Sequence, residues 1–234
     1  MDRLHLQREE NMERAASLRQ CPLFASISAE ELNSLLGCLS AAIRRFQKDE
    51  FVFLAGDRIS SIGIVLSGSV RVLQEDFWGR RMILAHIEPG GLFGEAFSCA
   101  DKKMLPISVV TAELSEVMLL DYRKILTTCT SACVFHTQLI MNMMQILAEK
   151  NILLIQKMEY LSKRTTRDKL LAFLSAQAQL TASNIVEIPF NRQELADFLC
   201  VDRSALSREL GAMQSEGLLR FEKSRFELLA SVVN

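Results

Sequence analysis

The sequence predicts an α+β protein in three successive parts: an antiparallel β-domain, one long helix, and a small helical domain closed by a β-hairpin. Between residues 51 and 120, short apolar stretches alternate with glycine-containing turns, which is typical of a small antiparallel roll or barrel. From residue 131 to residue 161 the apolar spacing is helical. Beyond residue 162 the pattern divides into capped helices and short strands. With 234 residues, 49% of them hydrophobic, the chain is long enough for two separate cores.

The N-terminal part begins with residues 1–20, which predict a solvated helix with a weak apolar face. Ser28 and Glu31 then have the spacing of a capping box and predict the start of a second helix. Strands are predicted at residues 51–54, 62–66, 70–74, 82–87 and 107–120. Because these strands are short and regularly spaced, we expect a β-roll.

The long helix carries two apolar stripes. One stripe repeats at alternating steps of four and three residues, as in a coiled-coil seam, and includes Ile140, Met144, Leu147, Asn151, Leu154 and Met158. If Ile140 is a d position, Asn151 is an a position, where one asparagine favours a parallel pair in fixed register. The other stripe is Phe135, Leu139, Met143, Ile146 and Leu153. The second stripe can cover the β-domain, so we predict that the first makes a homodimer; the alternative is that the first merely packs on the chain's own β-domain.

Residues 191–213 predict two short helices joined by a tight turn at residues 200–201, which is a helix-turn-helix. Asn191 and Glu194 form a capping box for the first helix, and Asp202 is the N-cap of the second. The inward positions of the second helix are Leu206, Leu210 and Met213, and the outward positions of its first two turns are Arg203, Ser204, Ser207 and Arg208. Outward residues at this end of a second helix reach base edges in the major groove, whereas an ordinary helical hairpin is the alternative.

The neighbours of this stretch favour a winged helix-turn-helix. Residues 185–188 predict a strand that ends at Pro189, and residues 218–229 predict two strands about a polar turn at 222–224. The net charge of the whole chain is −1, and residues 162–234 hold ten basic against nine acidic residues. DNA affinity must therefore come from local placement of charge. The predicted DNA contacts are Arg192, Arg203, Ser204, Ser207, Arg208, Lys223 and Arg225.

Composition and motifs exclude several classes. The chain has no run of about 18 apolar residues, and its N-terminus is too charged for a signal peptide, so we expect a cytoplasmic protein without a membrane partner. We find no Ser/His/Asp set, metal-spaced cluster or glycine-rich phosphate loop, and we predict that it is not an enzyme. Six cysteines in such a chain are expected to be free thiols.

These three parts, in this order, resemble the family of the cyclic-AMP receptor protein and the fumarate-nitrate regulator, bacterial transcription factors of the CRP/FNR type. The resemblance runs from Pro22 to Ala230. Its most specific stretches are Pro22-Leu23-Phe24, Gly56-Asp57, Leu66-Ser67-Gly68-Ser69-Val70, Gly90, Phe93-Gly94-Glu95, Asn191-Arg192-Gln193-Glu194-Leu195-Ala196, and residues 203–208. The resemblance implies a cyclic nucleotide-binding-like sensor domain over residues 1–130, a dimerisation helix over 131–161, and a winged helix-turn-helix over 162–234. A polar break at residues 162–166 would be the hinge between the last two.

The resemblance fails at the effector pocket. In the nucleotide-binding members, a glycine and a glutamate begin a phosphate-binding cassette, and an arginine and a serine about ten residues later bind the cyclic phosphate. Gly94 and Glu95 match the first pair, but Leu105 and Pro106 stand at the second. Neither residue supplies the cation or donors that a buried phosphodiester needs, so we predict that cyclic AMP does not bind.

Other cofactors of the family meet similar obstacles. Cys21 and Cys38 are too far apart for the cysteine cluster of the iron-sulfur members. Haem stays open, with His86 and His136 as the internal histidines. Cys129 and Cys133, at i and i+4, are either small buried residues or a redox-sensing or metal-binding pair.

The functional prediction is a dimeric, sequence-specific transcription regulator on an inverted-repeat operator, controlled by an unknown effector or redox signal and acting with RNA polymerase. Carried over by position, Arg208 is the candidate for bidentate contact with guanine, and Arg203 for contact with a base or a phosphate. Ser204 departs from the glutamate of the best-known branches, whereas Ser207 resembles the regulator branch, where a serine reads a thymine. The alternative is a ligand-binding regulatory subunit that acts through protein contacts.

Overall fold

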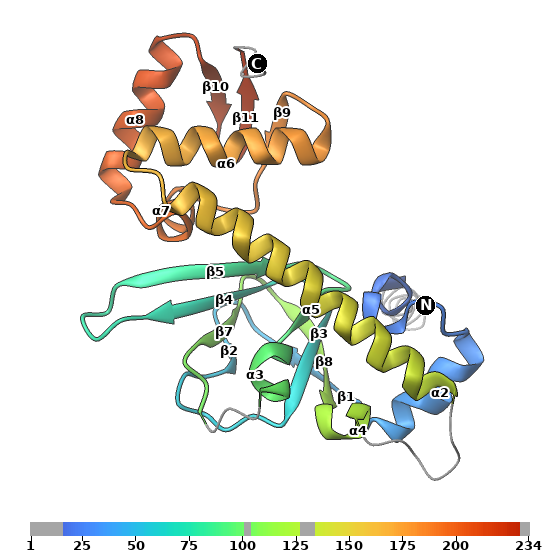
Figure 1. The fold of residues 1–234 in the computed structure, drawn as a ribbon. Coiled ribbons are helices and arrows are strands. Elements are labelled where there is room, and N and C mark those ends of the chain that lie inside the picture. The colour runs from blue at the N-terminus through green and yellow to red at the C-terminus, as the bar shows by residue number, and fades with distance from the viewer. Residues whose placement is uncertain (1–15, 101–103, 127–133, 230–234) are drawn as a thin grey trace, which may run out of the picture. The chain divides into compact units, whose positions relative to one another are not determined.

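The computed structural model describes residues 16–100, 104–126 and 134–229 (Figure 1). It has two compact units. The first contains the described residues up to Glu75 together with Leu84–Lys150, and the second contains Asp76–Ile83 together with the described residues from Asn151 onward. The predicted α+β class is confirmed, with antiparallel sheets in the N-terminal part, one long helix, and a C-terminal helix-turn-helix with a small sheet.

Residues 16–20 are helical, as predicted, and the rest of the helix expected over residues 1–20 lies outside the described residues. Two short helical elements follow, η1 (Pro22–Phe24) and α2 (Ala29–Cys38). The predicted capping box begins α2: the Glu31 carboxylate accepts from the Ser28 backbone N–H at 2.8 Å, and the Ser28 hydroxyl accepts from the Glu31 N–H at 3.4 Å. These two bonds satisfy amides that have no partner within the helix.

Eight strands of the chain form two four-stranded sheets, in the orders β1-β8-β3-β6 and β2-β7-β4-β5. Their bounds are β1 Ala42–Phe46, β2 Phe51–Phe53, β3 Ser61–Ser67, β4 Val70–Glu75, β5 Arg81–Ile87, β6 Leu92–Phe93, β7 Ser108–Thr111 and β8 Ser115–Asp121. β8 pairs antiparallel with both β1 and β3, and β7 pairs antiparallel with both β2 and β4. A short helix, α3 (Glu95–Cys99), lies between β6 and β7, and another, α4 (Tyr122–Leu126), follows β8.

The sequence did not predict every element of this roll. β1 exposes four of its five residues and so lacks the apolar alternation that marks a strand. β6 has only two residues. The single stretch expected over residues 107–120 is divided into β7 and β8, which are separated by a turn without glycine.

The long helix α5 (Val134–Leu161) packs one stripe against the core of the first unit. Leu139, Met143 and Ile146 are buried together with Leu23 and Phe24. This confirms the covering role expected of the second stripe for these three residues. Leu153 belongs to the second unit and is 56% exposed.

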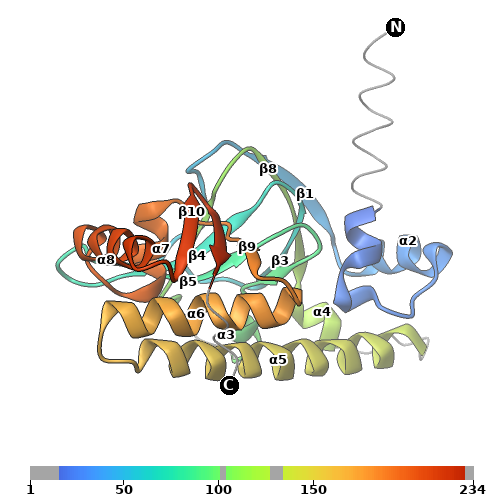
Figure 2. The ribbon, with the colours of Figure 1, turned by 90° about the horizontal axis from the view of Figure 1, so that it is seen from above.

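The second unit forms around one apolar core that includes Phe173, Leu195 and Phe226. Its elements, besides the end of α5, are α6 Thr166–Thr181, β9 Ile185–Glu187, α7 Arg192–Leu199, α8 Arg203–Ser215, β10 Leu219–Glu222 and β11 Arg225–Leu228. The strands make an antiparallel sheet in the order β10-β11-β9, and Figure 2 shows β10 and β11 side by side. The wing is thus a hairpin with a two-residue turn, Lys223-Ser224.

Candidate DNA interface and sensor pocket

The first helix of the helix-turn-helix, α7, begins where the sequence predicts. The Asn191 side chain accepts from the N–H groups of Gln193 at 2.9 Å and Glu194 at 3.0 Å, and the Glu194 carboxylate accepts from the Asn191 N–H at 2.8 Å. At its other end Cys200 adopts a left-handed φ of +52°, and the Val201 N–H donates to the Ala196 carbonyl at 3.0 Å. The chain therefore turns sharply enough for α8 to cross α7.

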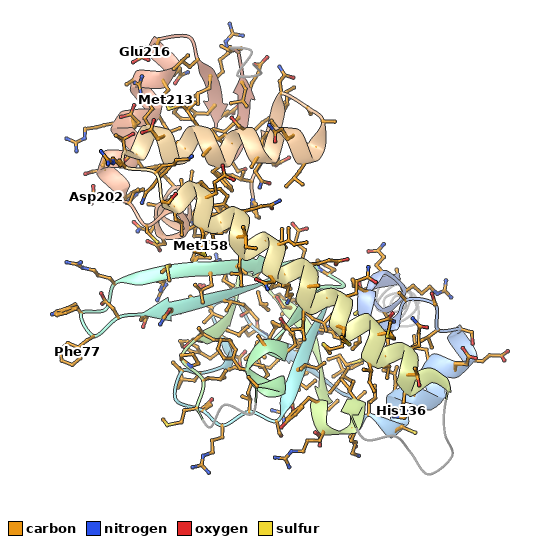
Figure 3. The ribbon with its side chains drawn as sticks, in the orientation of Figure 1. Phe77, His136, Met158, Asp202, Met213 and Glu216 are labelled. Carbon is orange, nitrogen blue, oxygen red and sulfur yellow. The ribbon has the colours of Figure 1, made fainter. Side chains whose placement is uncertain are left out.

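The second helix, α8, separates a buried side from an exposed side. Asp202 caps it by accepting from the Ala205 N–H at 2.9 Å. Leu206, Leu210 and Met213 are fully buried. The four predicted reading residues lie together on the exposed side of the first two turns: Arg203, Ser204, Ser207 and Arg208. In Figure 3, Asp202 and Glu216 mark opposite ends of the helix.

Ser204 is engaged by the cap of its own helix. Its hydroxyl donates to the Asp202 carboxylate. That bond, with the Ala205 amide and the nearby charge of Arg208, holds the pKa of Asp202 below its usual value. Because the hydroxyl already has a partner, Ser204 has less capacity for base reading than the two arginines beside it.

The predicted DNA contacts near the wing differ from one another in exposure. Lys223 and Arg225 are exposed at the turn. Arg192 is half-buried, with its guanidinium 4.8 Å from the ring centroid of Phe221 and 5.6 Å from that of Phe226. Burial lowers the pKa of Arg192. Arg192 therefore lies against the wing, unlike the exposed reading residues of α8.

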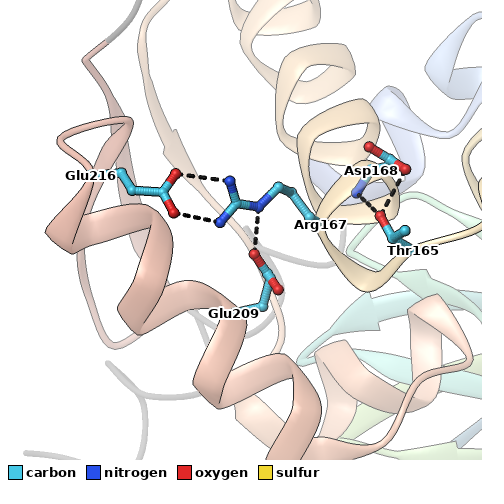
Figure 4. Close-up of polar contacts among 5 residues, drawn as sticks. All are labelled: Thr165, Arg167, Asp168, Glu209 and Glu216. Atoms are coloured by element: carbon cyan, nitrogen blue, oxygen red, sulfur yellow. Dashed lines mark hydrogen bonds and ion pairs between the residues drawn. The ribbon is translucent and has the colours of Figure 1, made fainter.

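An arginine that sequence reasoning missed ties α8 to α6. The Arg167 guanidinium donates twice to Glu216, at 2.7 and 2.8 Å, and its Nε donates to Glu209 at 2.5 Å (Figure 4). These bonds raise the pKa of Arg167 and lower that of Glu216. The available signal was the spacing of the two glutamates, which are seven residues apart and therefore share one face of α8.

The effector pocket of the resemblance contains an internal ion pair. Glu95 follows Gly94, which has a φ of +83°, and is only 4% exposed. Its Oε1 accepts from the Lys150 Nζ at 2.7 Å, and the same Nζ donates to the Leu92 carbonyl at 2.6 Å. Glu95 Oε2 is buried without a hydrogen-bond partner. A lysine of α5 thus supplies the cation beside this carboxylate.

The other half of the cassette is apolar in the structure too. The Leu105 side chain is buried in the core that contains Phe53 and Phe93. The Leu105 backbone donates to the Asp57 carbonyl at 2.9 Å and accepts from the Gly56 N–H at 2.8 Å. Pro106 is exposed. Neither side chain has a charge or a donor for a phosphate.

The predicted seam of α5 is largely exposed in the single chain. Met144, Leu154 and Met158 are 63%, 55% and 70% exposed; Asn151 is exposed, and Ile140 and Leu147 are intermediate. Met158 is labelled on α5 in Figure 3. Three further exposed apolar residues, which the seam prediction did not include, widen this face: Met141, Ile152 and Ile155.

The remaining candidates are scattered. Cys129 and Cys133 lie outside the described residues. Burial raises the pKa of the Cys21 thiol to about 11, whereas Cys38 and Cys200 are exposed. His136 is buried in α5, and His86 lies in β5. Across the described ranges, no group of three or more His, Cys, Asp or Glu is placed to hold a metal ion. In the same ranges, no helix combines the length and apolar character needed to cross a membrane.

Comparison with known proteins agrees with this architecture. The family model of the cyclic nucleotide-binding domain matches residues 43–131, and that of the Crp-like helix-turn-helix domain matches residues 168–230. The transcriptional activator protein FnrA of Stutzerimonas stutzeri is 25% identical, over 94% of this chain and 91% of its own length. The cyclic AMP receptor protein of Thermus thermophilus is 26% identical, over 90% of this chain and 94% of its own.

Two solved structures are similar in fold. The c-di-GMP responsive global regulator CLP of Xanthomonas campestris has a TM-score of 0.72 at 20% identity and covers 87% of this chain and 100% of its own. FixK2 of Bradyrhizobium japonicum has a TM-score of 0.64 at 19% identity and covers 83% of this chain and 99% of its own.

A cyclic nucleotide-binding domain joined to a Crp-like helix-turn-helix domain defines a transcription regulator that binds DNA through its C-terminal part. The members of this class are regulators and not enzymes. The chain belongs to the family of the cyclic-AMP receptor protein and the fumarate-nitrate regulator, the CRP/FNR family.

Proposed function

We propose that the protein is a homodimer that binds an inverted-repeat operator and answers to a signal other than cyclic AMP. The observation that carries this proposal is the exposed side of α8, with Arg203, Ser207 and Arg208 beside each other above a fully buried apolar side. Residues at this end of a recognition helix reach base edges. The planar fork of Arg208 fits the two major-groove acceptors of guanine, and Arg203 is placed for a base or a phosphate.

The homodimer is supported by the exposed apolar face of α5. Large apolar side chains that stay more than half exposed over several helical turns are typical of an interaction surface. The steps of four and three residues fit a second copy of the same helix, and Asn151 would fix the register. Two recognition helices related by a two-fold axis meet half-sites about 34 Å apart, which requires an inverted repeat.

A signal other than cyclic AMP is supported by the pocket residues. The cyclic phosphate needs a cation and donors, and Leu105 and Pro106 supply neither. Glu95, which resembles the glutamate that takes the ribose hydroxyl, is already held by Lys150. Under this proposal, the chain lacks the side chains that would bind the cyclic phosphate, and its glutamate for the ribose hydroxyl is paired with a lysine.

The proposal divides the chain into a sensor domain (residues 1–130), a dimerisation helix (131–161) and a DNA-binding domain (162–234), with the hinge at 162–166. The hinge precedes Arg167, whose bonds to Glu209 and Glu216 connect the start of α6 to the recognition helix. Movement at the hinge would therefore carry α8 with it. In this proposal the dimer acts on RNA polymerase in the cytoplasm.

The DNA part of the proposal is tested by selecting duplexes from a random-sequence library with the wild-type protein. The recovered sequences should contain an inverted repeat. Arg208→Ala should then lose about 1–3 kcal/mol of preference for the selected duplex over scrambled DNA. Lys48→Ala, an exposed lysine of the sensor domain, is the matched control and should bind as the wild type does. Failure of the wild type to enrich any sequence would favour a regulatory subunit that acts through protein contacts.

The signal is tested on the same duplex. Cyclic AMP should leave the affinity unchanged, and a clear increase would contradict the proposal. A parallel titration with c-di-GMP is informative, because the similar Xanthomonas campestris protein is described as c-di-GMP responsive. The native mass of the free protein, compared with that of Leu154→Glu, tests the dimer: the wild type should have twice the mass of the chain, and the variant a smaller mass.

A further inference from the structure

Arg192 combines an interface position with an internal attachment. It is the first residue of α7, directly after the Asn191 cap. Its guanidinium lies over the rings of Phe221 and Phe226, at 4.8 and 5.6 Å from their centroids, and its Nη2 donates to the Lys223 carbonyl at 3.4 Å. One planar side chain therefore contacts both strands of the wing and its turn.

The two rings belong to the wing itself. Phe221 in β10 and Phe226 in β11 face each other in the strand pairing, and their ring centroids are 6.0 Å apart. Phe226 is fully buried, whereas Phe221 is intermediate. An arginine stacked on aromatic faces is attracted by their π-electrons, and the attraction is stronger where water is excluded. Arg192 thus packs against this aromatic pair.

The turn of the wing has a conformation that needs support. Lys223 has a φ of +52°, which is the left-handed region that non-glycine residues seldom adopt. The strand side is held separately, since β11 pairs with β9 and the Ile188 N–H donates to the Ser224 carbonyl at 3.0 Å. The bond from Arg192 adds a contact at the preceding carbonyl, that of Lys223.

We propose that Arg192 is a positioning residue: it fixes the tip of the wing so that Lys223 meets the DNA backbone, and it does not itself bind a phosphate. Its aromatic contacts and its bond to Lys223 hold the guanidinium against the wing. Lys223 is exposed at the tip, where its side chain can reach a phosphate. The inference rests on the proposed DNA contact of the wing.

The opposing role is a direct phosphate contact by Arg192, and the two roles predict different double variants. Each phosphate contact contributes about one unit to the slope of log affinity against log salt concentration. If Arg192 acts through Lys223, then Arg192→Ala, Lys223→Ala and the double variant should all lower the slope by about one. If Arg192 binds a phosphate itself, the double variant should lower the slope by about two, and the losses of affinity should add.

Arg192→Lys separates the roles again, because it keeps the positive charge but loses the planar stack. A positioning role predicts that Arg192→Lys binds as weakly as Lys223→Ala, and that backbone amides of residues 222–226 exchange faster with solvent than in the wild type. A direct phosphate role predicts near wild-type affinity for Arg192→Lys. Near wild-type affinity, or an additive double variant, would overturn the inference.

The probe is the duplex that the wild-type protein selects from random sequence, measured between about 50 and 200 mM salt. Lys48→Ala is the control for loss of one charge. If the wild type selects no duplex, the proposed function has failed. If the wild type binds and Lys223→Ala has an unchanged slope, Lys223 makes no phosphate contact and the inference has failed by itself.

Discussion

The outer face of α8 and the pocket at Glu95 differ in whether their charged side chains are exposed or buried. On α8, Arg203 and Arg208 are exposed beside a cap that is complete without them. At Glu95, the carboxylate is buried and paired with Lys150 of α5. The first arrangement leaves charge available to an external polyanion, whereas the second satisfies charge within the chain. The exposed arginines fit the proposed DNA contact, and the internal pair at Glu95 fits the proposal that cyclic AMP is not the signal.

The largest effect is expected from breaking that internal contact. Lys150→Met removes the cation and leaves the Glu95 carboxylate buried. A buried pair that loses one partner costs about 3–5 kcal/mol, and because Lys150 is partly exposed we expect about 3 kcal/mol of lost unfolding free energy. Urea unfolding measures this loss.

The second variant of the pair is the control. Glu95→Gln on the Lys150→Met background removes the isolated charge, so the double variant should recover most of the stability. If Lys150→Met alone has the unfolding free energy of the wild type, the internal pair does not stabilise the pocket. The contrast with the exposed charges of α8 would then not hold.

The next largest effect on stability is expected from Lys157, a buried cation that contacts α7. Lys157, in the last turns of α5, donates from Nζ to the Ile83 carbonyl at 2.6 Å and lies 3.9 Å from the Phe198 ring centroid. Burial lowers its pKa to about 8 from 10.5. Between these two values the unfolded chain binds more protons than the folded chain, so this group adds stability as the pH rises.

From pH 8 to pH 10 the gain from Lys157 should be about 2 kcal/mol, because one pKa unit corresponds to about 1.4 kcal/mol. The measurement is the difference in unfolding free energy between the wild type and Lys157→Met at the two pH values. Other groups titrate in both proteins and cancel. A difference that does not change with pH would show that Lys157 keeps its usual pKa.

A smaller effect, on DNA preference, is expected from changing the planar guanidinium of Arg208. Arg208→Lys keeps the charge on α8 but loses the rigid bidentate geometry. We expect about 1 kcal/mol less preference for the selected duplex over scrambled DNA, with the salt slope unchanged. An unchanged preference for the selected duplex would mean that the bidentate fork of Arg208 does not read a base.

The smallest effect concerns the bonds between α6 and α8. Arg167→Gln removes the donors to Glu209 and Glu216, which lie near the surface where water and salt screen charges. We expect a slightly lower Tm at low salt, and a difference from the wild type that shrinks as salt is added. A Tm equal to that of the wild type at low salt would mean that α8 is held by its apolar side alone.

Local rules predicted α8 well. Its caps, its buried stripe and its exposed side depend on spacings of three and four residues, which the sequence displays directly. The capping boxes at Ser28 and Asn191 are confirmed for the same reason. The long helix was predicted to start within a few residues of its first described turn.

Contacts between distant residues were not predictable in this way. Glu95 and Lys150 are 55 positions apart, and Arg167 reaches Glu209 and Glu216 over more than forty. Arg192 was predicted as a DNA contact because its charge is visible in sequence, whereas its stacking depends on two wing phenylalanines that only the fold brings near. Whether the seam, wing and reading residues act as proposed stays a prediction.

If the proposed homodimer forms through the exposed side of α5, the behaviour of the protein depends on its own abundance. A chain whose apolar stripe is covered only by a second copy has an unfolding free energy that rises with protein concentration, by mass action. At protein concentrations below the dimer dissociation constant, the concentration of dimer, and so of paired recognition helices, grows as the square of the total protein concentration. A modest change in expression would then produce a larger change in operator occupancy, before any effector is bound.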